Sequence, residues 1–134
     1  MTTLGFVLAF MLWISPALAQ DSTLVGHYTV AGTNPDGVPY TSTAEIQEAE
    51  GIFRLEWRDK DRTVAVGMGV VDGTTLAVVF QTDGGLIGLV SYRINGQTLT
   101  GRWIFPGHPS IMTEVLTRVD ERLHGAEKGP SQRL

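Results

Sequence analysis

The sequence predicts an all-β protein built as a single antiparallel meander of eight strands. Two observations carry this prediction: turn-forming dipeptides recur along the chain, and the segments between them alternate apolar and polar residues. Weaker breaks at 50–51, 59–61 and 106–109 add to four strong turn signals, and seven breaks define eight strands. The strong signals favour type I′ hairpin turns and are Asp36-Gly37, Asp72-Gly73, Asp83-Gly84 and Asn95-Gly96.

The expected strands are the short segments that these breaks bound. In the third of them, Phe53, Leu55 and Trp57 alternate with charged residues, which places three large apolar side chains on one face. Neighbouring segments repeat this period of two, so their apolar faces need a common core. The strands are expected at Leu24–Gly32, Tyr40–Glu48, Ile52–Arg58, Arg62–Val71, Thr75–Thr82, Leu86–Asn95, Gln97–Phe105 and Ile111–Val119.

Closure of the meander is expected because a barrel removes the two exposed edge strands that an open sheet would leave. Glycines inside the strands, at Gly67, Gly69, Gly88 and Gly101, favour the curvature and close approach that a barrel needs. The expected architecture is a closed β-barrel of the general lipocalin or avidin kind. An open two-sheet sandwich is the alternative.

The first nineteen residues have the pattern of a cleavable secretory signal. The apolar run from Leu4 to Ile14 is too short to span a bilayer, which needs about 20 residues, but it fits the apolar region of a signal peptide. Pro16 and a small-residue cleavage site follow, so we expect cleavage between Ala19 and Gln20. The expected product is soluble and periplasmic or secreted, with an uncleaved N-terminal anchor as the alternative.

Composition narrows the class further. The chain has 134 residues, is 43% apolar and 18% charged, and carries a net charge of −4, which fits one globular domain. This charge argues against a nucleic-acid binder, whose Lys and Arg would cluster. There is no Cys, so stability depends on packing and hydrogen bonds. The barrel is expected over 20–119, followed by a polar, flexible tail over 120–134.

Motifs for catalysis and for metal binding are absent from the sequence. His27, His108 and His124 are isolated from one another, and no pair of metal ligands has a recognisable spacing. No G-x-S-x-G elbow or phosphate-binding loop occurs, and most of the acidic residues lie in turns or on polar faces. We therefore expect a protein that is not an enzyme and uses no metal or cofactor.

Glu114 is the exception among the acidic residues. It shares a face with Met112 and Leu116 if the eighth strand is regular, and it would then point into the barrel. A slipped register or a position at the rim explains the residue equally simply. The rim or slipped position is the favoured interpretation, because buried carboxylates are rare unless they are paired.

Aromatic residues in the expected strands are the candidate binding residues. An eight-stranded barrel can be filled by its own side chains or can hold one small ligand. The candidates for lining such a site are Phe53, Trp57, Trp103, Tyr28 and Tyr92. The alternative is that these rings only fill the core, since a domain of this size needs aromatic bulk to be stable.

Several segments also carry a resemblance to a known family. They are the segment Gly26–Tyr40, with the sequence GHYTVAGTNPDGVPY, the residues Leu55-Glu56-Trp57 and the segment Leu99–Trp103. Together they resemble a family of small exported bacterial proteins often labelled fibronectin-binding proteins. The resemblance runs from Gly26 to about Leu116. It implies a non-enzymatic protein that recognises an extracellular protein partner through its barrel surface or its loops.

Two other functions stay open beside recognition of a protein partner. One is the carriage of a small apolar ligand between Trp57, Trp103 and Phe53, and the other is inhibition of, or an accessory role to, an exported enzyme. An interior cavity of at least roughly 300 Å³ would support the ligand carrier, whereas a filled barrel would exclude it.

Overall fold

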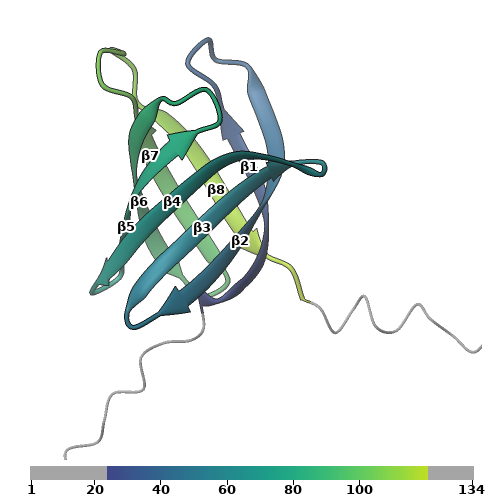
Figure 1. Cartoon of the computed structure of the whole chain (residues 1–134), viewed down its shortest axis with the longest axis vertical. Coiled ribbons are helices and arrows are strands. Elements are labelled where there is room, and N and C mark those ends of the chain that lie inside the picture. Colours follow the sequence, from purple (N-terminus) through teal and green to yellow (C-terminus); the bar gives the residue numbers. More distant parts are fainter. Residues whose placement is uncertain (1–23, 121–134) are drawn as a thin grey trace, which may run out of the picture.

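The computed structural model describes residues 24–120, which form a closed antiparallel barrel (Figure 1). Each strand pairs with the next in the chain, and β8 pairs with β1 to close the barrel. The predicted meander and its closure are confirmed, and the two-sheet sandwich is excluded. The strands are β1 (Gly26–Thr33), β2 (Pro39–Ala49), β3 (Ile52–Asp59), β4 (Arg62–Asp72), β5 (Thr75–Thr82), β6 (Ile87–Asn95), β7 (Thr98–Ile104) and β8 (Met112–Arg118).

The observed strand ends lie within two residues of those expected, because the turn signals act locally. Gly73 and Gly96 adopt positive φ angles of 59° and 58°, but neither neighbour of either glycine does, so these hairpins are not the expected type I′ turns, which need two such residues in a row. The weaker signal at Glu50 and Gly51 has that pair, with φ angles of 54° and 79°. The predicted signal segment, with its cleavage between Ala19 and Gln20, and residues 121–134 of the predicted tail lie outside the described residues. The described part of the chain contains no helix with the length and hydropathy needed to cross a membrane.

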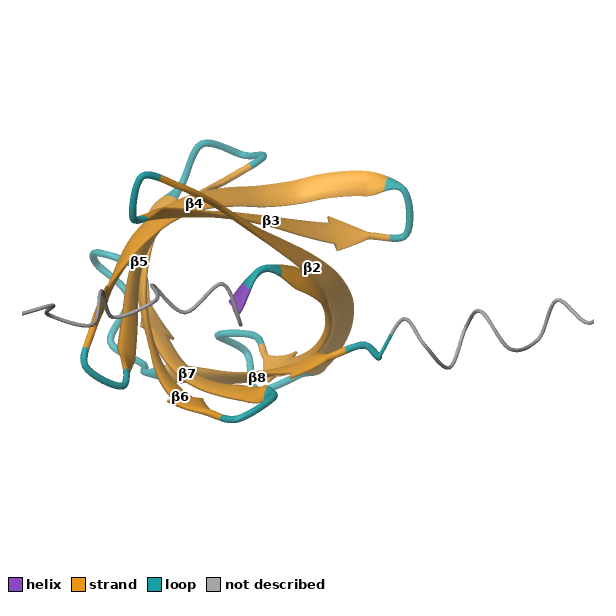
Figure 2. Cartoon of the chain, turned by 90° about the horizontal axis from the view of Figure 1, so that it is seen from below, coloured by secondary structure: helices purple, strands orange, loops and turns teal. Residues whose placement is uncertain are grey.

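Alternation along each strand divides the side chains between the barrel interior and the outer surface. In β3, Phe53, Leu55 and Trp57 are buried, as their period of two predicts. Viewed from below, the strands form a ring (Figure 2). The seven turns fall into two groups in such a meander. Turns β1–β2, β3–β4, β5–β6 and β7–β8 share one end of the barrel, and the other three share the opposite end.

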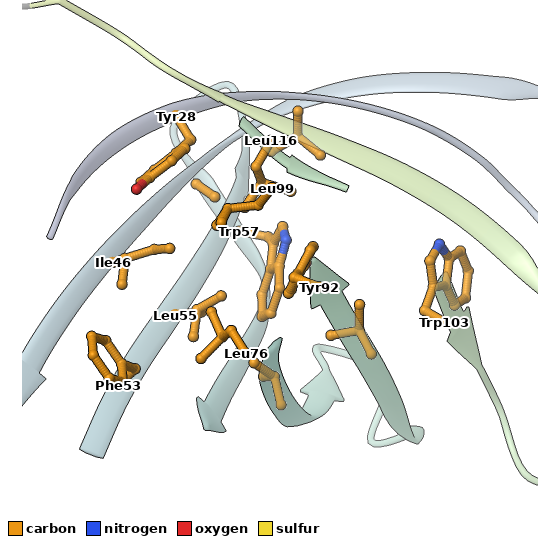
Figure 3. Packing of buried hydrophobic residues seen from close by; sticks show 14 of the residues in the cluster. Tyr28, Ile46, Phe53, Leu55, Trp57, Leu76, Tyr92, Leu99, Trp103 and Leu116 are labelled. Carbon is orange, nitrogen blue, oxygen red and sulfur yellow. The ribbon is translucent and has the colours of Figure 1, made fainter. Parts of the chain in front are cut away.

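Buried side chains pack together at the end with three turns. Leu24, just before β1, is 3% exposed, and its carbonyl accepts a 2.7 Å hydrogen bond from the Tyr28 hydroxyl. Arg118 lies over the Tyr28 ring at 5.6 Å from its centroid. Figure 3 shows Phe53, Ile46 and Leu55 grouped on one side of the core and Trp103 on the other, with Trp57 and Tyr92 between them in this view. We call the end with three turns the closed end.

Candidate functional site

The end with four turns holds a cavity of about 370 Å³. Its rim includes Asn34, Asp59 and Asp83, which lie at the β1–β2, β3–β4 and β5–β6 turns. This volume exceeds the minimum that supports a ligand site, and it lies within the range of roughly 300–1,000 Å³ found for small-molecule pockets. Five aromatic side chains line the cavity: Tyr40, Trp57, Phe80, Trp103 and Phe105.

Phe80 occupies the centre of this aromatic lining. Its ring centroid lies 5.9 Å from that of Trp57, 6.1 Å from Trp103 and 5.7 Å from Phe105, with the rings tilted or edge-on. Such geometries are favourable for aromatic pairs. Gly88 is the cross-strand partner of Phe80, and a Cβ there would come within 2.3 Å of the Phe80 ring. The glycine thus leaves the space in which this ring sits.

Glu114 brings a carboxyl group to the cavity from β8. The strand is regular, Met112, Glu114 and Leu116 all point inward, and the Glu114 side chain is 6% exposed. The rim or slipped position favoured from the sequence is therefore wrong. Hydroxyl groups replace the charged partner that a buried carboxyl was expected to need. Tyr40 donates a 2.6 Å hydrogen bond to Oε2, and Tyr92 donates to Oε1.

Two glycines make this arrangement possible. Gly32 of β1 and Gly101 of β7 are the cross-strand neighbours of Glu114, and each is paired on its other side with one of the tyrosines. A Cβ at Gly32 would lie 2.5 Å from the Tyr40 hydroxyl, and one at Gly101 would lie 2.6 Å from the Tyr92 ring. Each tyrosine therefore reaches across a glycine to the carboxyl between them.

Burial dominates the electrostatics of this group. It raises the pKa of Glu114, and the hydroxyls of Tyr40 and Tyr92 and the indole of Trp57 act against that rise. Burial, followed by the neighbouring Glu114 charge, raises the pKa of both Tyr40 and Tyr92 far above the ordinary tyrosine value. Both tyrosines therefore stay neutral donors at physiological pH.

The indole N–H groups of Trp57 and Trp103 are buried and make no hydrogen bond to any of the residues 24–120. That of Trp57 still lowers the pKa of Glu114 and of Tyr92, and that of Trp103 lowers the pKa of Tyr40. Both indole dipoles thus favour negative charge at the tyrosine and carboxyl oxygens. Within the described residues Glu114 is the sole buried charged side chain, so no buried cation faces it.

The structure divides the five residues predicted for ligand binding between two regions. Trp57 and Trp103 line the cavity, and Tyr92 lies beside it as a partner of Glu114. Phe53 and Tyr28 belong to the closed end and do not line the cavity. A role in ligand binding stays a prediction for all five.

Sequence reasoning missed Tyr40, Phe80 and Phe105 as cavity residues. A signal for them exists in the meander itself, because every second turn returns the chain to the same end of the barrel. Inward-facing aromatic residues close to the first, third, fifth and seventh turns therefore gather at one end. Tyr40 follows the first turn, and Phe80 and Phe105 precede the fifth and the seventh.

A second hollow, of about 640 Å³, lies beside the start of β1 and the end of β8. Its lining includes His27, Glu45, Gln47 and Arg118, and it contains no Phe, Tyr or Trp. His27 and Gln47 are exposed and Glu45 and Arg118 are half-buried, and this hollow lacks the aromatic walls of the first cavity.

Comparison with known proteins gives a likeness of fold. No family model matches the chain, and no curated protein matches it. Among solved structures, a redesigned β-barrel has a TM-score of 0.64 at 17% identity, with 74% of this chain and 94% of that chain covered.

Two further redesigned barrels, mFAP1 and mFAP0, are described as bound to DFHBI. The structure of mFAP1 has a TM-score of 0.62 at 17% identity and covers 72% of this chain and 95% of its own. That of mFAP0 has a TM-score of 0.61 at 18% identity and covers 72% and 99%. At such identities the likeness shows the barrel fold alone.

Proposed function

We propose that the protein binds a small aromatic or apolar molecule inside the open end of its barrel. The observation that carries this proposal is the cavity of about 370 Å³ with five aromatic side chains in its lining. Mutual ring contacts and the Phe80–Gly88 pairing hold these walls in place before any ligand arrives. A preformed apolar site gains affinity because little conformational freedom is lost on binding.

The similar barrels support this proposal through their architecture. Those of mFAP1 and mFAP0 are described as bound to DFHBI, so a fold of this shape can hold a small molecule. The side chains that line this cavity, and not the likeness to barrels that bind DFHBI, are the basis for the class of ligand proposed here.

The direct test is binding of a neutral two-ring probe, naphthaleneethanol, to the full chain by equilibrium dialysis. Ala65 lines the cavity from β4, whereas Ala77 of β5 is exposed on the outer surface. Ala65→Phe is expected to fill the cavity and abolish binding, and Ala77→Phe adds the same ring outside and is expected to leave binding unchanged. Equal binding by both variants would contradict the proposal.

A second candidate function is recognition of a protein partner through the outer face of the barrel. Met68, Val79, Leu89 and Ile104 are successive cross-strand partners on β4 to β7, and each is at least 40% exposed. Contiguous exposed apolar surface of this kind is typical of protein interaction sites. We call these four residues the outer apolar row.

Fibronectin, the partner implied by the family resemblance, is the test protein for the outer apolar row. Leu89→Lys places a charge within the row, and Thr43→Lys places the same charge on the exposed face of β2. Capture of fibronectin by the immobilised full chain is expected to be lost in Leu89→Lys and kept in Thr43→Lys. Absence of capture by the unchanged chain would rule out fibronectin as the partner.

A further inference from the structure

We propose that the ligand of the barrel carries a positively charged nitrogen, which pairs with the carboxylate of Glu114. This inference rests on the proposed function and names the class of molecule that the cavity selects: an aromatic or apolar body with a protonated amine.

The carboxyl oxygens of Glu114 can accept more hydrogen bonds than the protein supplies to them. Its two carboxylate oxygens accept hydrogen bonds from Tyr40 and Tyr92, which leaves each oxygen with further acceptor capacity. Tyr40 also lines the cavity, and its hydroxyl oxygen keeps acceptor capacity while its proton is donated to Glu114. The deep part of the cavity therefore offers acceptors to a ligand, and a protonated amine supplies the matching donors.

The indole N–H groups of Trp57 and Trp103 are closed to a ligand. Trp57 Nε1 and Trp103 Nε1 have almost no exposed surface, so a ligand in the cavity meets the faces and edges of these rings rather than their donors. A ligand carboxylate or phosphate beside Glu114 would thus face that carboxyl without an exposed indole donor, and Arg62, the cationic side chain of the lining, lies at the rim. This arrangement disfavours anions.

The charge around the cavity points the same way. Three carboxyl groups and one guanidinium line it, belonging to Asp59, Asp83, Glu114 and Arg62. Arg62 lies 3.4 Å from Asp83 at the rim, so these two charges offset each other. The remaining ionisable groups are carboxyls, and no other charged side chain of residues 24–120 is buried with Glu114. Buried charges are costly unless paired, and a cationic ligand supplies that pair.

The aromatic lining adds an attraction of its own for a cation. Ring faces carry partial negative charge and attract ammonium groups, by about 0.5–2 kcal/mol for a single well-placed ring. Trp57 and Trp103 line the cavity together with Glu114. An amine close to the carboxylate can therefore contact aromatic rings at the same time.

Three probes with the same ring test this inference by equilibrium dialysis with the full chain: naphthaleneethylamine, naphthaleneethanol and naphthaleneacetate. The amine is expected to bind at least about tenfold more tightly than the alcohol, as a hydrogen-bonded charge pair would provide, and the acetate most weakly. Glu114→Gln is expected to remove the advantage of the amine over the alcohol. Equal binding of amine and alcohol to the unchanged chain would overturn the inference while the proposed function stands.

The unchanged chain supplies a second readout that does not depend on a variant folding. Affinity for the amine is expected to fall as the pH is lowered and Glu114 becomes protonated, whereas affinity for the alcohol stays constant. The titratable groups that face Glu114 are Tyr40 of β2 and Tyr92 of β6, both neutral in this range, while β1 and β7 present glycines. Asp59, Asp83 and Arg62 lie at the rim.

The effect of charge at the rim is distinguished from that of Glu114 by measuring the pH dependence of amine affinity in Asp59→Asn. An unchanged fall in that variant supports Glu114 as the partner, and its disappearance there would overturn the assignment. If none of the three probes binds to the unchanged chain, both the inference and the proposed function fail. Binding of the alcohol in wild type and in Ala65→Phe alike would contradict the cavity itself.

Discussion

The Tyr40 hydroxyl donates a hydrogen bond to the carboxyl of Glu114, which lies 74 positions further along the chain. Gly32, between them on β1, leaves room for the Tyr40 ring. This contact exists because β1 closes the barrel by pairing with both β2 and β8. A buried acid on β8 is thereby satisfied by neutral donors rather than by a base.

Removal of the Tyr40 hydroxyl is expected to destabilise the barrel. Tyr40→Phe leaves Oε2 of Glu114 without its donor in a buried place, which costs about 1–3 kcal/mol. The free energy of unfolding, measured in urea, should fall by this amount. The pKa of Glu114 should rise further, because one of the groups that opposes the effect of burial is lost. An unchanged unfolding midpoint would show that the hydroxyl does not support the carboxyl.

The glycine beside Glu114 on β7 is expected to tolerate no side chain. In Gly101→Ala the new Cβ would lie 2.6 Å from the Tyr92 ring, so the ring must move away from the carboxyl. Overpacking of this kind costs about 1–3 kcal/mol. Gly84→Ala is the matched control, since its Cβ would meet nothing closer than the Thr82 hydroxyl at 3.8 Å. Equal thermal stability of the two variants would contradict the role of Gly101.

Stability should depend on pH through Glu114. Because its pKa in the folded protein is raised above the ordinary value of 4.5, the folded state holds this proton more tightly than the unfolded state does. The stabilising contribution of the protonated group is full below 4.5 and is lost as the pH rises through the raised pKa. The stability of Glu114→Gln relative to the unchanged chain should therefore increase over that window in urea unfolding. A constant difference would contradict the raised pKa.

The closed end should affect stability without affecting the ligand site. Tyr28→Phe removes the hydrogen bond that the hydroxyl donates to the Leu24 carbonyl and the one that it accepts from Arg118, and it is expected to cost about 1–2 kcal/mol. Tyr28 does not line the cavity, so the affinity for naphthaleneethanol should stay the same. A loss of affinity larger than the error of equilibrium dialysis would show that the two ends are coupled.

The fold could be predicted from the sequence because its signals are local. Turn dipeptides and a period of two act over a few residues, and they place the strands correctly to within two residues. The alternation of Met112, Glu114 and Leu116 also predicts correctly that Glu114 faces inward. The rarity of buried carboxylates without a partner outweighs that indication in the sequence, because the partners Tyr40 and Tyr92 lie far from Glu114 along the chain.

The rest of the site could not be predicted because its contacts are long in sequence. Tyr40 and Tyr92 lie 74 and 22 positions from Glu114, and closure of the barrel brings all three together. Phe53 and Trp57 share one face of β3, yet Phe53 lies at the closed end and Trp57 at the cavity. Alternation gives the face of the sheet, whereas the end of the barrel depends on the whole meander.

The most direct test of the account is a nuclear magnetic resonance titration of the ¹⁵N-labelled full chain with naphthaleneethylamine. Trp57 and Trp103 line the cavity, whereas Met68 and Leu89 lie on the outer apolar row. We expect the indole N–H signals of the two tryptophans to shift in proportion to occupancy while the backbone signals of the outer apolar row stay in place. Shifts confined to Met68, Leu89 and their neighbours, with both indole signals unmoved, would contradict a ligand site inside the barrel.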